Sequence, residues 1–402
     1  MKNNILHPDK SIVTLVLISI LAVSLTLQHE FNLKQALFFL VGIGFGVSLL
    51  HAMFGFTGGW RMFIREKRSI GIRAQLLLLA ISSILFFPLV GDVFPNISAQ
   101  AALGQVGISV LCGAFIFGIG MQLGGGCGSG TLFTVGQGQV DMLITLSFFI
   151  IGAVLGSYHL PWWLSLPNIG QVSLITELSI FPALIIQLIL FFVMYLVVKK
   201  IERKKHNEVQ PLYIKDTHKS MTDRAIHGPW PIWVGVISLS VFGLLTLVMA
   251  GYPWSITFAF GLWGAKILSA LGADVASWAY WSSGYPAKAL NSSVLSDITS
   301  IMNFGIILGA MLAAALAGKY APAGKLKSKR ILTAVVGGLL LGYGARLGFG
   351  CNIGALLGGI ATGSLHGWLW LVAAFIGGIV GVKIRVALEL DAPYGVKYEK
   401  SK

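Results

Sequence analysis

Two cysteines stand in matched glycine-rich stretches and are the residues best suited to do chemistry. Cys127 lies in GMQLGGGCGSG, residues 120–130, and Cys351 lies in GARLGFGCNIG, residues 344–354. A thiol is a weak hydrogen-bond donor, and its thiolate form can exchange with sulfane sulfur. Both cysteines are therefore candidates for contact with a sulfur-containing ligand.

The glycines around the cysteines predict breaks in the helices that carry them. Non-helical backbone at membrane depth is tolerated only inside protein or around a wet cavity, and glycine adopts turns that other residues resist. We expect Gly126, Gly128 and Gly350 to shape these breaks. A helix that restarts after each cysteine would direct its N-terminal amides and the positive end of its dipole at the thiol. Two such helix ends facing each other predict a site for a small anion.

Two polar residues near the second cysteine are further candidates for substrate contact. Arg346 lies near the end of an apolar run, where an arginine is a functional candidate, with snorkelling or pairing as the alternative. Asn352 follows Cys351 directly and either caps the next helix or touches the substrate. Cys112, in the middle of an apolar run, is interpreted as a small buried hydrophobe.

Two other interpretations of the cysteines stay open from the residues alone. They could form a sulfur or selenium relay that passes persulfide to a cytoplasmic carrier protein. They could also belong to a permease for a soft metal such as Cu(I), although no Met or His lies at convincing ligand spacing and no CxxC is present. We predict no metal site, no cofactor and no enzymatic activity.

The composition indicates that a membrane positions these residues. The chain of 402 residues is 55% hydrophobic and 11% charged, whereas a soluble domain carries about 25% charged residues. Several apolar runs are long enough, or nearly so, to cross the ~30 Å hydrocarbon layer as helices. We therefore predict an all-α polytopic membrane protein, whose first helix is uncleaved. The expected helices are 11–28, 35–53, 71–90, 101–122, 141–157, 177–199, 230–250, 255–271, 298–317, 331–348 and 368–388.

The net charge of +14 is concentrated between the apolar runs, at residues 61–73, 199–219 and 319–330. This distribution marks cytoplasmic loops under the positive-inside rule, and no basic block is interleaved with aromatic residues as in a nucleic-acid groove. We predict a bacterial inner-membrane protein in the lipid bilayer with no nucleic-acid partner. Its N-terminus, linker and C-terminus are expected in the cytoplasm.

The two halves of the chain match each other. Aligning Cys127 with Cys351 superimposes the glycines of the two motifs, and one position out of that register Gly152 and Gly156 match Gly377 and Gly381. The helix before Cys127 follows a stretch without Lys or Arg, whereas the helix before Cys351 follows a basic stretch. The motifs should thus enter the membrane from opposite faces, as in an inverted-topology repeat with re-entrant or broken half-helices.

The repeat predicts how the chain is divided. We expect an N-terminal helix and its flank (1–34), a first transmembrane repeat (35–199), a basic cytoplasmic linker (200–229), a second repeat (230–390) and a cytoplasmic tail (391–402). The number of crossings is consistent with these orientations only if residues 273–290 also cross, as a broken or re-entrant piece.

At these motifs the sequence resembles the YeeE/YedE family of membrane proteins. The resemblance rests on GGGCGSG, on GARLGFGCNIGA followed by SLHGWLW, and on GFTGGWRMF before a basic loop. It implies an hourglass-like, pseudo-twofold permease for thiosulfate or a related sulfur or selenium compound. It also implies that Cys127 and Cys351 line the central path and contact thiosulfate through thiol–sulfur hydrogen bonds. The family often has another cysteine where this chain has Gly55, so a three-cysteine relay is incomplete here.

Together these observations predict an inner-membrane permease that passes a small, thiosulfate-like anion through a central constriction. The expected substrate contacts are Cys127, Cys351, Gly126, Gly128, Gly350, Asn352 and Arg346.

Overall fold

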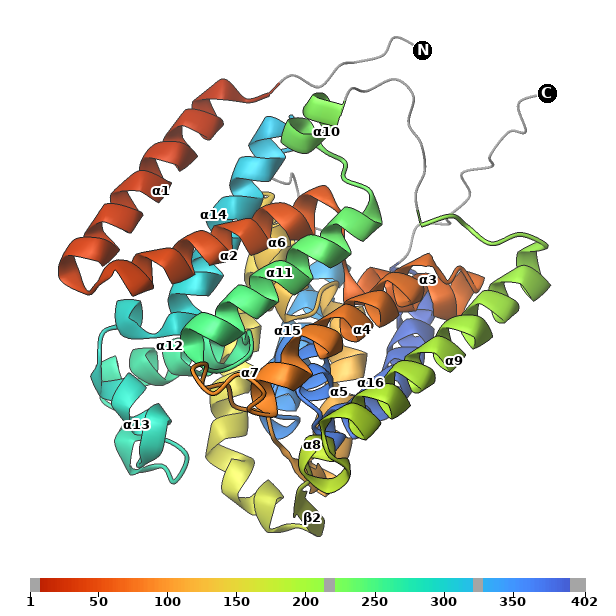
Figure 1. The fold of residues 1–402 in the computed structure, drawn as a ribbon. Helices are drawn as coiled ribbons and strands as arrows, with labels where there is room; N and C mark the ends of the chain where they lie inside the picture. Colours follow the sequence, from red (N-terminus) through yellow and green to blue (C-terminus); the bar gives the residue numbers. More distant parts are fainter. Residues whose placement is uncertain (1–7, 213–220, 321–327, 391–402) are drawn as a thin grey trace.

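A computed structural model describes residues 8–212, 221–320 and 328–390 of the chain (Figure 1). Helices make up nearly all of the regular structure, and ten helical segments in the described ranges are long and apolar enough to cross a membrane. This confirms the predicted all-α polytopic membrane protein. The helices are α1 (Lys10–Glu30), α2 (Leu33–His51), α3 (Phe56–Glu66), α4 (Ile70–Val90), α5 (Ile108–Gly124), α6 (Gly128–Gly136), α7 (Val140–Ser165), α8 (Leu174–Leu178), α9 (Ile180–His206), α10 (Met221–His227), α11 (Ile232–Ala250), α12 (Thr257–Ala270), α13 (Gly284–Asn291), α14 (Ile298–Leu316), α15 (Ser328–Leu347) and α16 (Leu365–Ala387).

Short elements complete the fold. A π-helix, η3, spans Asn352–Gly359, and two 3-10 turns, η1 and η2, span Val275–Ser277 and Val294–Ser296. Strands β1 (Gln105–Gly107) and β2 (Asn168–Gln171) pair antiparallel.

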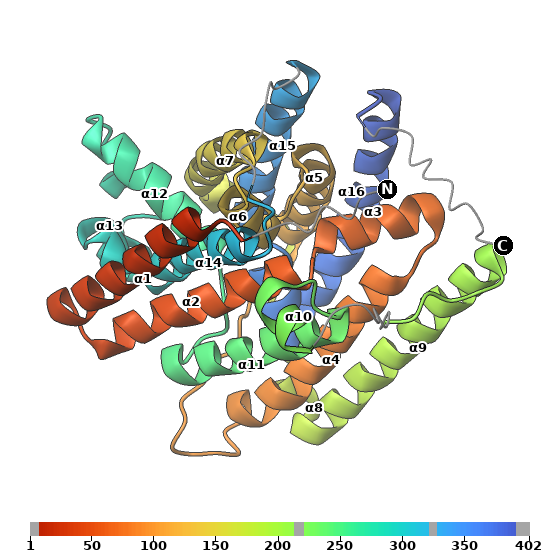
Figure 2. The same ribbon diagram turned by 90° about the horizontal axis from the view of Figure 1, so that it is seen from above.

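The helices form a packed centre with two outlying members. The most extensive helix interfaces join α7 with α15, α2 with α14, and α5 with both α15 and α16. By contrast, only 11% of the most apolar window of α1 and 17% of that of α9 is buried. Figure 2 shows these two helices at opposite margins of the assembly. Their exposed apolar side chains, such as Leu21 and Phe181, match the surface that lipid requires.

Glycines let the central helices approach closely. A Cβ atom at Gly152 of α7 would overlap the carbonyl of Leu339 in α15, and one at Gly377 of α16 would overlap the carbonyl of Phe115 in α5. Phe115 and Leu339 occupy equivalent positions when Cys127 is aligned with Cys351. Such small-residue contacts replace the hydrophobic effect as a source of packing between membrane helices.

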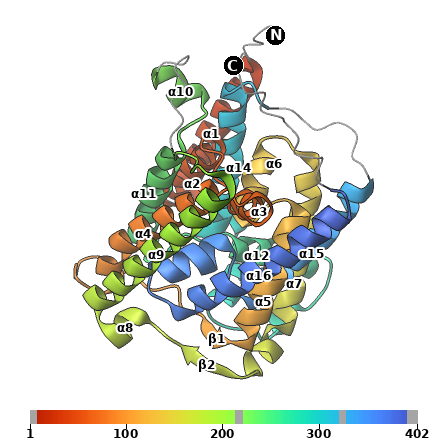
Figure 3. The same cartoon turned by 90° about the vertical axis from the view of Figure 1, so that its right-hand side faces the viewer.

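One end of the assembly carries a band of arginines and is termed the basic end. The band comprises Arg61, Arg68, Arg73, Arg330 and Arg385. Each of these arginines forms a hydrogen bond or an ion pair with a residue near the end of another helix. Figure 3 shows α10 at this end and β1, β2 and α8 at the opposite one.

Helix α9 runs to His206, beyond the expected end at residue 199, because Glu202 is buried against the loop before α4. The Glu202 carboxylate accepts hydrogen bonds from Ser69 N (3.1 Å) and Gln210 N (3.2 Å). The first part of the expected linker is therefore helical and packed. Residues 213–220 and 321–327 and the expected tail, 391–402, lie outside the described residues.

One expected helix is too short to cross, and the extra crossing that the expected orientations required is absent from the described residues. Helix α12 is short and is not among the candidate spans in the described chain, and residues 273–290 form η1 and α13 instead of a crossing helix. The chain reaches the protein interior at Ile256, whose methyl group lies 3.4 Å from the Cβ position of Gly128, and no described helix between α11 and α14 is long enough to cross. The expected orientations therefore no longer require a crossing by residues 273–290. Helix α5 also begins at Ile108 and not near residue 101, because the preceding residues pair as β1 with β2.

Candidate functional site

Both cysteines occupy breaks between a long helix and a short one. Helix α5 ends at Gly124 and α6 restarts at Gly128, with Cys127 as its N-cap at φ −90° and ψ −164°. Helix α15 ends at Leu347 and η3 starts at Asn352, with Cys351 as its N-cap at φ −106° and ψ −163°. The backbone is thus nearly the same at the two thiols, and each thiol stands at the start of a helix.

Glycine is required immediately before each cysteine. A Cβ at Gly126 would lie 2.9 Å from the backbone nitrogen of Thr131, and one at Gly350 would lie 2.6 Å from that of Ala355. Gly350 also has a φ of +146°, which side chains rarely tolerate. Each glycine therefore lets the chain pass close to the first turn of the helix that follows.

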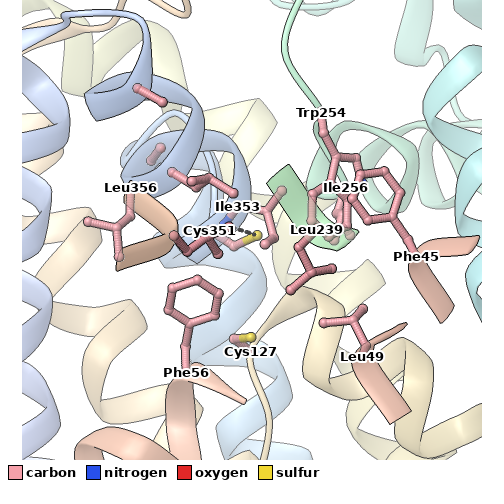
Figure 4. Close-up of a cluster of buried hydrophobic side chains, with 14 of the residues drawn as sticks. Phe45, Leu49, Phe56, Cys127, Leu239, Trp254, Ile256, Cys351, Ile353 and Leu356 are labelled. Carbon is pink, nitrogen blue, oxygen red and sulfur yellow. Dashed lines mark hydrogen bonds between the residues drawn. The ribbon is translucent and has the colours of Figure 1, made fainter. Parts of the chain in front are cut away.

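The two breaks meet each other inside the protein. The Cβ position of Gly128 lies 2.9 Å from Cys351 Sγ and 3.4 Å from a methyl group of Ile256. Figure 4 shows the two thiols near each other, with Phe56 on one side and Leu239 and Ile256 on the other. The first residue of α6 therefore packs directly on the thiol of the opposite break.

The polar contacts of the two thiols differ. Cys127 Sγ lies 3.5 Å from the hydroxyl of Ser129, and either atom can be the donor. Cys351 Sγ accepts a hydrogen bond from Ile353 N at 3.4 Å. Both side chains are buried. Cys112, which was predicted to be buried, lies on α5 and is only half-buried.

A cavity of about 520 Å³ extends from Cys127 to the basic end. Its walls come from the α2–α3 break, the Cys127 motif, α6 and the starts of α7 and α15. Cys127, Gly126 and Gly130 line it, whereas Cys351 is not among its lining residues in the described chain. Of the two thiols, only that of Cys127 therefore faces this cavity.

Charged groups surround the cavity. Arg61, Arg330 and Arg385 line it together with one carboxylate among the described residues, Asp141. Arg61 Nε donates to Gln122 Oε1 at 3.1 Å and Arg385 Nη1 donates to the Gln122 carbonyl at 2.6 Å. The balance of charge in the cavity is positive, which favours anions.

Asn352 does not cap η3, since Cys351 takes that position. Its side chain is fully buried, and neither amide atom has a hydrogen-bond partner within the part of the chain that the structure describes. A buried amide without a partner is unfavourable by about 1–3 kcal/mol. Asn352 is therefore available for a ligand beside Cys351.

Arg346 packs against Tyr280, in the segment between α12 and α13. Its Nη1 donates to the hydroxyl of Tyr280, and its guanidinium lies 4.5 Å from the centre of the Tyr280 ring. Its Nε and Nη2 are buried without a hydrogen-bond partner among residues 8–212, 221–320 and 328–390. The structure therefore brings Arg346 together with an aromatic cluster and not with the cysteines.

Two amides anchor two further helix breaks and were not predicted. Asn303 of α14 donates from Nδ2 to the carbonyl of Ile256 at 3.0 Å, where α11 gives way to α12. Gln75 of α4 donates to the carbonyl of Gly55 at 3.4 Å, where α2 gives way to α3. The sequence feature that could have identified these two residues is a polar amide side chain within an otherwise apolar helical run.

Gly55 itself lines the cavity in an ordinary extended conformation, with φ −131° and ψ 127°. A Cβ there would meet no described atom within 4 Å. The position where the resembled family often has a cysteine therefore has room for a side chain that faces the cavity.

The chain is similar to a family of transport proteins and to individual transporters. Residues 51–380 match the family described as sulphur transport. The thiosulfate transporter TsuA of Spirochaeta thermophila is 27% identical over 351 residues, which cover 84% of this chain and 95% of that protein. TsuA of Escherichia coli (strain K12) is 24% identical over 348 residues, or 83% of this chain and 89% of that protein.

A shorter match is found with a second kind of transporter. The probable transporter YedE of Escherichia coli (strain K12) is 32% identical over 155 residues, covering 39% of this chain. That match spans only 36% of the length of YedE.

Proposed function

The chain belongs to the sulphur transport (YeeE/YedE) family, and from this premise we propose that it is a permease for a small, thiosulfate-like anion. Relatives that align along nearly their whole length are named thiosulfate transporters. One observation carries the proposal. Two buried thiols, each at the start of a helix, lie near each other (Figure 4), and one of them lines a positively charged cavity.

The geometry supports a passage by successive thiol contacts. At Cys127 and at Cys351 the helix start directs backbone N–H groups towards the thiol, and such helix starts favour anions. Each thiol can donate a weak hydrogen bond to a soft sulfur atom. The apolar side chains around the thiols, including Phe56, Leu239 and Ile256, are shown in Figure 4 and disfavour strongly hydrated ions. An anion would leave one thiol for the other across the junction at Gly128.

Asn352 and Arg346 have separate parts in this proposal. Asn352 offers a buried amide beside Cys351 to the oxygen atoms of the anion. Arg346, with two buried nitrogen atoms that lack partners in the described chain, would attract the anion at the end opposite the cavity.

We propose that the two halves form an inverted repeat. Glycine-mediated packing of α7 on α15 has its counterpart in α16 on α5, at positions that match, or fall one residue out of register, when the cysteines are aligned. The break held by Gln75 of α4 likewise has its counterpart in the break held by Asn303 of α14. These pairs support a pseudo-twofold, hourglass-like arrangement around the thiols.

The orientation follows from charge. The basic end is assigned to the cytoplasmic face of the inner membrane, as the positive-inside rule requires. The cavity would then release its anion into the cytoplasm, where a sulfur-carrier protein could receive it. The expected cytoplasmic tail, 391–402, lies outside the described residues.

Uptake of radiolabelled thiosulfate into proteoliposomes tests the function. Variants C127A and C351A should each reduce the initial rate at least about tenfold, equivalent to ~1.4 kcal/mol. C112A should retain it, because Cys112 lies within helix α5 and is not among the described residues that line the cavity. Undiminished uptake in both C127A and C351A would remove the thiols from the pathway.

Mass spectrometry of the purified protein after exposure to thiosulfate separates passage from relay. Passage leaves Cys127 and Cys351 unmodified. A stable added sulfur atom on either thiol would instead support persulfide transfer to a carrier.

A further inference from the structure

The cavity at the basic end holds a buried carboxylate that a pathway for anions does not need. Asp141 lies in the first turn of α7, and its side chain is only 8% exposed. Its Oδ2 accepts a hydrogen bond from Arg330 Nη1 at 2.9 Å. Its Oδ1 is buried without a partner within residues 8–212, 221–320 and 328–390. Both residues line the cavity.

The two side chains of this ion pair differ in exposure, which would let Arg330 exchange Asp141 for another partner. The side chain of Arg330 is 57% exposed, whereas that of Asp141 is buried in the cavity wall. Their hydrogen bond joins one nitrogen to one oxygen, and a guanidinium carries five N–H donors in all. The Arg330 side chain can thus rotate towards the cavity while Asp141 keeps its position.

Charge explains why Asp141 needs this partner. A bare carboxylate in a confined cavity would repel an approaching anion, and a buried carboxylate is unfavourable without compensation. An arginine without a competing carboxylate would have the opposite effect, because it would hold the anion too firmly. Conduction requires binding that is strong enough for entry and weak enough for departure.

We propose that the cavity contains a second anion-binding station, separate from the thiols, where a small oxyanion and Asp141 compete for Arg330. With the station empty, Arg330 neutralises Asp141. With an anion present, Arg330 donates to its oxygen atoms through the planar guanidinium, and Asp141 promotes release by drawing Arg330 back. The pathway role of this station rests on the proposed function, whereas its binding of oxyanions does not.

The G55C variant provides a reporter that works without transport. Gly55 lines the same cavity and has room for a side chain. The thiol introduced there is treated with anionic 2-sulfonatoethyl methanethiosulfonate and, separately, with neutral methyl methanethiosulfonate. Peptide mass spectrometry follows modification at residue 55 apart from the native cysteines. The ratio of the two rates reports the potential inside the cavity.

Added in this background, D141N should raise the anionic-to-neutral rate ratio about threefold or more, and R330Q should lower it by a similar factor. The double variant D141N/R330Q should fall between them. Thiosulfate, or sulfate as a second oxyanion, should slow the anionic reagent in the G55C protein and should protect less in R330Q. Size-exclusion profiles and the neutral reagent's rate control for folding.

If D141N and R330Q leave the rate ratio unchanged, or if the double variant matches R330Q, Asp141 and Arg330 do not compete in this cavity. Protection that is equal in R330Q and the parent would also exclude Arg330 from the station. Because alkylation needs no transport, these outcomes are distinct from a failure of thiosulfate uptake.

Discussion

The Cβ position of Gly128 lies 2.9 Å from the sulfur of Cys351. The first residue of the helix that follows one cysteine therefore packs against the other cysteine, although the two motifs belong to opposite halves of the chain. At the position equivalent to Gly128, the second motif has Asn352. The two cysteine motifs thus share a backbone conformation but differ in the residue after the cysteine. Only Asn352 carries a side chain, because a side chain at Gly128 would overlap Cys351.

This contact predicts that a single methyl group blocks the passage. G128A should reduce thiosulfate uptake at least about tenfold, because the added carbon must displace Cys351 Sγ or separate the two breaks. G58A is the matched control, since a Cβ at Gly58 meets no described atom within 4 Å and Gly58 also lines the cavity. Uptake by G128A equal to that of G58A would contradict a tight junction at Gly128.

Thiol accessibility should follow the position of the cavity. In inside-out vesicles, the thiol introduced by G55C should react with a membrane-impermeant methanethiosulfonate at least about tenfold faster than Cys351, whose side chain is fully buried. The measurement is site-resolved mass spectrometry over time. Equal rates at residue 55 and Cys351 would mean that the cavity extends past Cys127 to Cys351.

Asn303 should hold the break beside the thiols. N303L removes the donor to the Ile256 carbonyl at roughly constant volume, and we expect a loss of about 1–3 kcal/mol in stability. Uptake should fall as well, because Ile256 packs next to Gly128. The thermal midpoint and the uptake rate are measured together. N291A, on α13 at the surface, is the control, and an effect of N303L no larger than that of N291A would exclude an anchoring role.

Arg68 provides an internal comparison of two ion pairs at the basic end. It lies 3.5 Å from Glu202, whose side chain is fully buried, and 3.3 Å from Glu208, whose side chain is 69% exposed. E202Q should destabilise the protein by about 3–5 kcal/mol, because Arg68 and Arg73 lose a buried partner. E208Q should have an effect of at most about 1 kcal/mol. Thermal unfolding in detergent measures both, and equal shifts would contradict the buried network.

Several features could be predicted from the sequence because they depend on local chemistry. Glycines around Cys127 and Cys351 indicate helix breaks, and the structure has them at those residues. Long apolar runs indicate membrane helices, although α12 is too short to cross. The expected orientations required residues 273–290 to cross as well, but these residues form η1 and α13, since aromatic and small residues suit a membrane interface as well as its interior.

Contacts between distant segments could not be predicted in this way. The meeting of Asp141 with Arg330 and of Asn303 with Ile256 depends on how helices pack in three dimensions. The spacing of residues along the sequence does not predict these two contacts. Capping was one of the two roles predicted for Asn352, because asparagine favours that position, but the cysteine before it has the required extended backbone.

The most direct test of the central claim is a structure of the protein with bound thiosulfate, using anomalous scattering to locate its sulfur atoms. A peak is expected at the junction of the two breaks, in contact with Cys127 Sγ or Cys351 Sγ and beside Gly128. A fully occupied thiosulfate found elsewhere, with the junction empty and uptake intact in C127A and C351A, would contradict it.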